Sequence, residues 1–199
     1  MKHRPIIFST PMVQAILDGK KTMTRRVMNP QPVLGKPWKD WIVDPDVMDL
    51  PTAYCPYGIK QDRLWVKETW AWIDNSEFDF DAESYVEYRA DNPGAKYPGE
   101  WPEEEARGNP EAPKWKSSIH MPKKHARIWL EITGVRVERL QDISDEDVLH
   151  EGFRMDNVSI FRLGYKGAFA ELWDSINKKK HPWSSNDWVW VLEFRKVTP

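Results

Sequence analysis

The sequence predicts an α+β fold, a small mixed β-barrel with helices packed at its openings. Three observations favour it. Short segments alternate apolar and polar side chains, which is typical of strands with one buried face. Few segments have helical periodicity. The last apolar segment, 188–195, is hydrophobic on both faces, so we expect a central strand there. This combination favours a barrel over a helical bundle.

Length and charge suggest one elaborated domain. The 199 residues fit a single domain, 1–199, with an acidic insertion rich in Trp and Pro at 73–117. Within 73–114 there are 12 acidic and four basic residues, so the rest of the chain is basic although the net charge is −2. A basic body favours a phosphate-bearing partner.

Composition also indicates in which compartment the protein works and which kinds of partner to expect. The single cysteine, Cys55, excludes an internal disulfide and suggests a reducing, cytoplasmic location. No apolar run follows the N-terminal charges and none has membrane-spanning length, so we expect no signal peptide and no membrane partner. The 12 tryptophans suggest platforms for stacking on bases, although a Trp-rich core explains them as well.

A helix and a basic turn follow the first expected strand, 4–8. Ser9 or Thr10 can cap the helix, Pro11 suits its first turn, and Gly19 suits its end. The turn at 19–26 then delivers lysine, arginine and threonine side chains from a fixed platform. A lysine beside other cations can act as a general base and activate a threonine. The alternative is an exposed basic turn after a surface helix.

The segment from Ser144 to Gly152 predicts a short helix. Ser144 and Asp147 approximate a capping box, Val148 and Leu149 should pack inward, and Gly152 should end the helix. Glu151 would then lie at the negative end of the helix dipole, which a nearby cation such as Lys21 would offset. The alternative is a solvated surface glutamate.

Further strands are expected at 22–28, 64–69 and 126–133, and an amphipathic helix at 165–177. Glu68 falls in phase with core-facing residues, so it must be paired or lie at the barrel mouth. Gly134 should introduce a β-bulge in the third of these strands. The Pro-rich stretch 29–54 is expected to be an ordered loop. Three lysines, 178–180, are expected to be a solvated loop.

The motif at 19–26 and several other segments of the chain resemble a known protein family. Gly19-x-Lys21-x-x-Thr24-x-Arg26 is similar to the G-x-K-x-x-T-x-R signature of ASCH domains, a branch of the PUA-like barrels. Segments 4–8, 61–70, 118–122 and 188–194 resemble the phage and prophage subgroup of that family. Two departures are Gln61, where glycine is usual, and the acidic insertion. The resemblance covers most of the chain outside that insertion.

The resemblance implies a hydrolytic site. In the related bacterial N4-acetylcytidine amidohydrolases a lysine and a threonine of this motif and a later glutamate act together. By similarity Lys21 is the base, Thr24 the nucleophile and Glu151 the acidic partner. We assign substrate contacts to a further set of residues: Arg25, Arg26, Trp65, Lys67, Glu68, Trp70 and His120.

The expected substrate is a modified nucleoside or RNA, with no cofactor and no metal, because the five histidines lack ligand spacing. Trp65, Trp70 or Trp129 could stack on the base, and Arg26 or backbone N–H groups could stabilise an oxyanion. The alternative function is a non-catalytic nucleic-acid-binding module, or a nuclease, that uses the same basic cleft.

Overall fold

A computed structural model describes residues 1–33, 37–38, 41–42, 52–74, 83–99, 101–152 and 157–198. The strands and helices, in chain order, are β1 (His3–Ile7), α1 (Thr10–Leu17), β2 (Met23–Val27), β3 (Pro37–Trp38), β4 (Trp41–Ile42), β5 (Arg63–Lys67), β6 (Trp70–Ile73), β7 (Tyr85–Tyr88), α2 (Glu103–Ala106), β8 (Trp129–Arg139), α3 (Asp145–His150), α4 (Asn157–Asn177) and β9 (Trp188–Val197). The predicted α+β class is confirmed.

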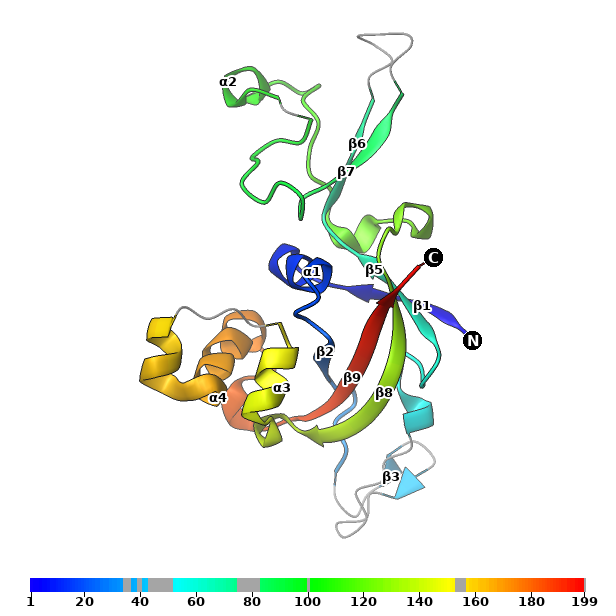
Figure 1. The fold of residues 1–199 in the computed structure, drawn as a ribbon, viewed down its shortest axis with the longest axis vertical. Coiled ribbons are helices and arrows are strands. Elements are labelled where there is room, and N and C mark those ends of the chain that lie inside the picture. The colour runs from blue at the N-terminus through cyan, green and yellow to red at the C-terminus, as the bar shows by residue number, and fades with distance from the viewer. Residues whose placement is uncertain are drawn as a thin grey trace.

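The main sheet has five strands in the order β1-β5-β8-β9-β2 (Figure 1). The β1–β5 pair is parallel, and the other three pairs are antiparallel. Within the described ranges β1 and β2 are edge strands, so the sheet does not close into the expected barrel. The side chain of Arg26 on β2 nevertheless donates from Nη2 to the carbonyl oxygen of Ile7, 2.7 Å away at the end of β1. The two edges therefore approach each other.

Strand β9 explains why its sequence is apolar on both faces. Trp190 and Leu192 pack in one hydrophobic cluster with Ile6, Phe8 and other residues. Val189 and Val191, on the opposite face, pack in a second cluster beneath α3 and α4. Because each face covers a separate core, β9 is central, as predicted, between β8 and β2.

Most local expectations are confirmed. Ser144 Oγ accepts a hydrogen bond from the Asp147 backbone N–H at the start of α3, and Gly152 with φ of +72° follows its last turn. The register of β8 against β9 shifts at Gly134, which is the expected bulge. Leu149 is half-exposed, so its predicted inward packing is wrong.

The expected helix at 165–177 is confirmed as the second segment of α4. Gly164, with φ of +68° and ψ of 173°, separates it from a first helical segment that begins at Asn157. The three lysines at 178–180 are exposed, as expected. The stretch expected to be an ordered loop at 29–54 lies mostly outside the described residues.

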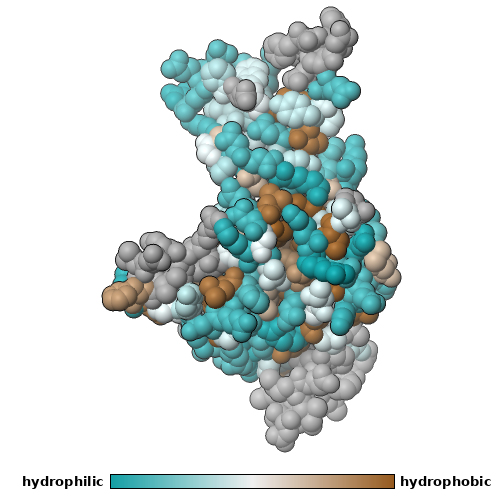
Figure 2. Space-filling model, viewed as in Figure 1, coloured by the Kyte–Doolittle hydropathy of each residue, from teal (hydrophilic) through white to brown (hydrophobic). Residues whose placement is uncertain are grey.

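Residues of the expected insertion form an arm on the body. Strands β6 and β7 pair as a hairpin, and α2 lies to one side of it (Figure 1). In the space-filling view the arm projects from the body as a narrower part (Figure 2). Among the described residues, no helix is both long enough and apolar enough to cross a membrane.

Candidate functional site

The predicted pair of Lys21 and Glu151 is formed. Lys21 Nζ donates to Glu151 Oε2 at 2.7 Å and to the Glu151 carbonyl oxygen at 2.8 Å. The two residues also form an isolated antiparallel bridge between the end of α3 and the start of β2. Both side chains are buried, with exposed fractions of 1% and 7%. Lys21 is therefore the cation that offsets the carboxylate at the end of α3.

Glycine allows this close approach. A Cβ atom on Gly152 would lie 2.5 Å from Cβ of Lys21 and 2.9 Å from Cβ of Ala15. Its φ of +72° is also unfavourable for other residues. Gly152 thus lets the α3 terminus rest directly on Lys21.

A cavity of about 580 Å³ lies beside this pair, between α1 and α4. Its polar wall contains residues of the basic turn and of the end of α3: Lys21, Thr24, Arg25, Arg26 and Glu151. Its apolar wall comes from both helices: Pro11, Met12, Leu17, Phe169, Leu172, Trp173 and Ile176. The three residues with predicted catalytic roles therefore share one cavity, which has the mixed lining typical of small-molecule sites.

Thr24 and Arg26 are adjacent on the same face of β2, since side chains alternate along a strand. Thr24 is buried, and its hydroxyl has no hydrogen-bond partner within the part of the chain that the structure describes. The Arg26 guanidinium lies over the Phe8 ring, 5.0 Å from its centroid. Its Nε is buried without a partner among the described residues. Both side chains thus keep hydrogen-bonding capacity at the cavity wall.

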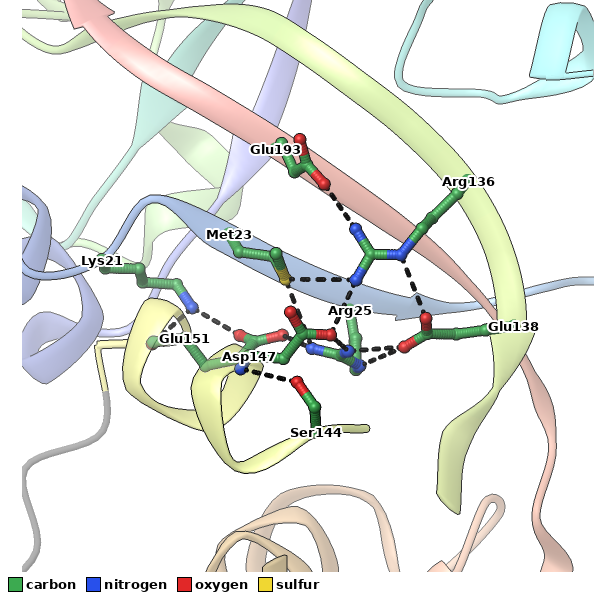
Figure 3. Close-up of polar contacts among 9 residues, drawn as sticks. All are labelled: Lys21, Met23, Arg25, Arg136, Glu138, Ser144, Asp147, Glu151 and Glu193. Atoms are coloured by element: carbon green, nitrogen blue, oxygen red, sulfur yellow. Dashed lines mark hydrogen bonds and ion pairs between the residues drawn. The ribbon is translucent and has the colours of Figure 1, made fainter. Parts of the chain in front are cut away.

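Arg25 differs from Arg26, because all five of its N–H groups are engaged (Figure 3). Nε and Nη2 donate to Glu138 Oε1 at 2.9 and 2.5 Å, and Nη2 also donates to Asp147 Oδ2 at 2.5 Å. Nη1 donates to Glu151 Oε1 at 3.3 Å and to Met23 Sδ. The side chain is fully buried. Arg25 therefore holds carboxylates in place and has no donor left for a ligand.

Sheet register explains this ion cluster. Arg25 on β2 lies opposite Val191 on β9, and Val191 lies opposite Arg136 on β8. Directly paired residues share a face of the sheet, so both arginines project toward α3. There Arg136 Nη2 donates to Asp147 Oδ2 at 2.7 Å. Glu138 and Glu193 complete the cluster on the same face.

Burial sets the protonation behaviour of the site. It lowers the pKa of the Lys21 ammonium, and although Glu151 acts in the opposite direction, the net shift is downward. The charges of Arg26 and Arg25 contribute to this lowering. Burial also lowers the pKa of the Arg26 guanidinium. A buried lysine with a lowered pKa is suited to proton transfer.

The other predicted substrate contacts lie elsewhere. The cavity lining contains none of Trp65, Lys67, Glu68, Trp70 or His120. Lys67 Nζ lies 5.6 Å from the Trp65 ring centroid and donates to the Ile119 carbonyl oxygen, whereas His120 is exposed in the same loop. These residues therefore gather around segment 116–127.

Glu68 belongs to that second group. Its side chain is 1% exposed and accepts two hydrogen bonds of 3.0 Å from Arg127, so the expected pairing is confirmed. Burial raises the Glu68 pKa, although Arg127 acts in the opposite direction. Trp70 is buried beside His125, with ring centroids 5.2 Å apart. Trp129 is also buried and outside the cavity lining.

Sequence reasoning missed two parts of the site. The ion cluster of Arg25 with Glu138 and Asp147 joins three elements, and no short spacing signals it. The apolar wall from Phe169 and Trp173 was identified only as a helix face, because a core-facing and a cavity-facing stripe have the same periodicity.

The described ranges contain no group of three or more His, Cys, Asp or Glu side chains arranged to hold a metal ion. No protein-family model, curated protein or solved structure matches the chain. Function is therefore inferred from the site itself and from the resemblance of its motif.

Proposed function

We propose that the chain is an ASCH-type PUA-like protein that hydrolyses the amide of N4-acetylcytidine, as a nucleoside or within RNA. One observation carries the proposal. Lys21 and Glu151, which are 130 residues apart in sequence, pair at 2.7 Å. Both line the same cavity as Thr24, whose hydroxyl has no partner among the described residues. These are the residues to which the motif resemblance gives catalytic roles. The proposal includes a cytoplasmic location, supported only by the single cysteine.

A PUA-like barrel is part of the proposal. Its support is the approach of the two sheet edges, where Arg26 on β2 bonds to Ile7 on β1. The residues that line the cavity come mainly from β2, α1 and α4, and the proposal takes these two helices as the ones packed at a barrel opening.

In the first half-reaction Thr24 Oγ attacks the acetyl carbonyl carbon, and the hydroxyl proton passes to the neutral Lys21 amine. The carbonyl π electrons move onto oxygen, and the Arg26 guanidinium stabilises this oxyanion. When the tetrahedral intermediate collapses, its C–N bond breaks. The cytosine N4 leaves with the proton carried by Lys21, and the acetyl group remains as a Thr24 ester.

In the second half-reaction water attacks the ester carbonyl and gives a proton to Lys21. The C–O bond to Thr24 breaks, and Thr24 recovers this proton from Lys21. The product leaves as acetic acid, which gives its proton to the solvent and becomes acetate. Glu151 keeps the lysine side chain oriented throughout and balances its charge when it is protonated. Lys21 and Thr24 thus end each cycle in their starting states.

The alternative, a phosphate-binding cleft without chemistry, receives less support from this wall. Lys20 pairs with Asp18, Lys21 pairs with Glu151, and the donors of Arg25 are used by carboxylates. In the contacts among the described residues, Arg26 alone of the turn's four basic side chains retains unused donors at the cavity. One guanidinium next to a buried carboxylate is a poor site for a nucleic-acid backbone.

The test is the release of cytidine from N4-acetylcytidine by purified protein, followed by chromatography. Thr24→Val removes the hydroxyl at constant shape, Thr24→Ser restores one, and Lys21→Met removes the amine. Lys20→Met is the matched control, because Lys20 is adjacent but exposed.

We expect Thr24→Val and Lys21→Met to lose about 10²-fold or more in turnover, a scale typical of general-base catalysis. Thr24→Ser should retain part of the activity, and Lys20→Met should equal the wild type. Absence of wild-type hydrolysis, or wild-type rates in Thr24→Val, would overturn the proposal.

A further inference from the structure

A second surface lies where the arm joins the body, outside the cavity lining. It consists of two tryptophans of β6 and basic residues of the following loop: Trp70, Trp72, Lys116, Lys123, Lys124 and His125. We call it the basic–aromatic surface. Its backbone is tied to the arm, because Trp70 and Lys116 exchange backbone hydrogen bonds of 3.3 and 2.7 Å.

The aromatic part is an ordered array of rings. Trp70 and Trp72 lie on the same face of the hairpin, since they are two residues apart on one strand. The His125 ring lies 5.2 Å from the Trp70 ring and 5.7 Å from the Trp72 ring, centroid to centroid. Trp70 is 6% exposed and Trp72 is 42% exposed. Part of the Trp72 ring is therefore accessible to a ligand, while its contact with His125, which also packs on Trp70, holds the ring in place.

The cationic part consists of lysines near these rings and next to them in sequence. Lys116 Nζ lies 5.0 Å from the Trp70 ring centroid. Lys123 and Lys124 directly precede His125, and Lys123 Nζ lies 5.2 Å from the Trp129 ring centroid and 3.2 Å from His3 Nδ1. Lys116, Lys123 and Lys124 are exposed, and none forms an ion pair with a carboxylate in the described part of the chain. The sequence from 114 to 127 contains no acidic residue. Among the described residues, the positive charge of these lysines is thus not compensated by an ion pair, in contrast to the charges of the cavity wall.

The histidine and the carboxylates near this surface do not neutralise the charge of its lysines by ion pairs that the described residues show. Burial, and then the charges of Lys124 and Lys116, lower the pKa of His125, so this ring is neutral at pH 7 and suited to stacking. Glu68 and Asp91 are two carboxylates close to this surface, and both are bound by Arg127. Glu87 on the hairpin accepts from the backbone N–H of Gly99. Among the arm's described acids, Asp74, Glu87 and Asp91 are engaged with other groups. Glu103, Glu104 and Glu105 lie on α2, away from this junction (Figure 1), and Glu83 and Glu111 lie elsewhere on the arm.

We propose that the basic–aromatic surface binds a single-stranded nucleic acid, with an unpaired base stacked on Trp72 and phosphates near Lys116, Lys123 and Lys124. Flat rings interleaved with unpaired cations suit this ligand, because every base has a face for stacking and each nucleotide carries a phosphate. A duplex hides its base faces, so it would use the lysines alone. This binding is independent of the proposed hydrolysis.

The surface is nevertheless connected to the cavity. The Tyr88 hydroxyl donates to the His125 carbonyl oxygen at 2.7 Å. Two residues later, Ala90 lines the cavity and accepts from Gln14 Nε2 on α1 at 3.1 Å. A strand bound at the surface would therefore lie on the same part of the molecule as the cavity rim.

The test is fluorescence anisotropy with a labelled uridine 15-mer, titrated with protein at several salt concentrations. The first variant replaces Lys116, Lys123 and Lys124 with glutamate, and the second is Trp72→Ala. The matched control replaces the three exposed lysines 178–180 with glutamate, which changes the net charge by the same amount.

We expect the first variant to bind the 15-mer at least tenfold more weakly. The slope of log K against log salt concentration should become smaller by about 2, because each lysine that contacts a phosphate of a single strand contributes about 0.7 to it. Trp72→Ala should weaken binding about 5- to 100-fold, as for loss of one stacked base. The control should bind within twofold of the wild type.

The proposal would be overturned if the wild type did not bind the 15-mer, if the 178–180 control lost as much affinity as the first variant, or if Trp72→Ala bound as tightly as the wild type. It would also be overturned if a duplex, or polyglutamate at matched charge, competed for the protein as well as an unlabelled single strand does. Because the readout is binding, it does not depend on turnover. Hydrolysis of free N4-acetylcytidine, measured alongside, should be unchanged in the lysine variant, so failure of one proposal is distinguishable from failure of the other.

Discussion

Replacing Gly152 with alanine should force the end of α3 away from Lys21. The added Cβ would lie 2.5 Å from Lys21 Cβ, 2.9 Å from Ala15 Cβ and 3.0 Å from Lys21 Cα, and one of these contacts is with backbone. Alanine would also have to keep a φ of +72°. Both effects destabilise the same junction, the one that positions the Lys21–Glu151 pair.

The magnitude follows from these two terms. A left-handed conformation costs alanine about 1–2 kcal/mol, and forcing a methyl group into a filled space costs about 1–3 kcal/mol. Gly152→Ala should therefore lower the free energy of unfolding by about 2–5 kcal/mol. Gly19→Ala is the matched control, because Gly19 has a φ of +71° and a Cβ added there would meet no described atom within 4 Å. It should lose only the conformational term.

The assay is urea unfolding followed by tryptophan fluorescence, with the midpoint and the m-value fitted for each variant. The difference between the two variants isolates the steric term, and we expect it to be about 1–3 kcal/mol. If Gly152→Ala and Gly19→Ala lose the same stability within about 0.5 kcal/mol, the close approach of Gly152 to Lys21 is not as described.

Two further predictions concern the charges of the site. Because Arg25 is fully buried among carboxylates, Arg25→Gln should lower the free energy of unfolding by about 3–5 kcal/mol. Arg195→Gln, which removes an exposed ion pair, should lower it by less than about 1 kcal/mol in the same urea experiment. Comparable losses in the two variants would contradict the stabilising role of the buried Arg25 cluster. The second prediction concerns pH. The pKa of Lys21 is lowered and its amine must be neutral to accept a proton, so kcat/KM for N4-acetylcytidine should rise with pH through a value below the ordinary lysine range and fall at lower pH. A pH–rate profile would count against Lys21 as the base if its acid limb lay at or above the pKa of a free lysine.

The sequence alone was sufficient for the local structure around the site. Helix α1 and the turn after Gly19 follow from proline and glycine signals that act within a few residues. Ser9 is the N-cap residue of α1, but its side chain makes no capping hydrogen bond, so that part of the prediction is wrong. Strand β9 and the bulge at Gly134 follow from apolar patterning and a single glycine. Such features depend on neighbouring residues, so they can be predicted from a short window.

The pairing of Glu151 with Lys21 could be only half predicted. The unfavourable position of a carboxylate at a helix end suggested a cation nearby, and Lys21 was a candidate, yet a solvated glutamate explained the sequence equally well. Only the packing of Gly152 on Lys21 decided between them.

Tertiary structure alone decided which of the two arginines faces the cavity with free donors. Arg25 and Arg26 are adjacent in sequence and chemically identical, but strand alternation sends one toward the carboxylates of β8 and α3 and the other toward Phe8. Tertiary structure also decided the place of five other predicted substrate contacts. The sequence assigned them to the site of Lys21, whereas the fold gathers them around segment 116–127: Trp65, Lys67, Glu68, Trp70 and His120. Sequence patterns identify the chemistry of a side chain and its local direction, whereas its partners come from strand register and helix placement, which join residues more than a hundred positions apart.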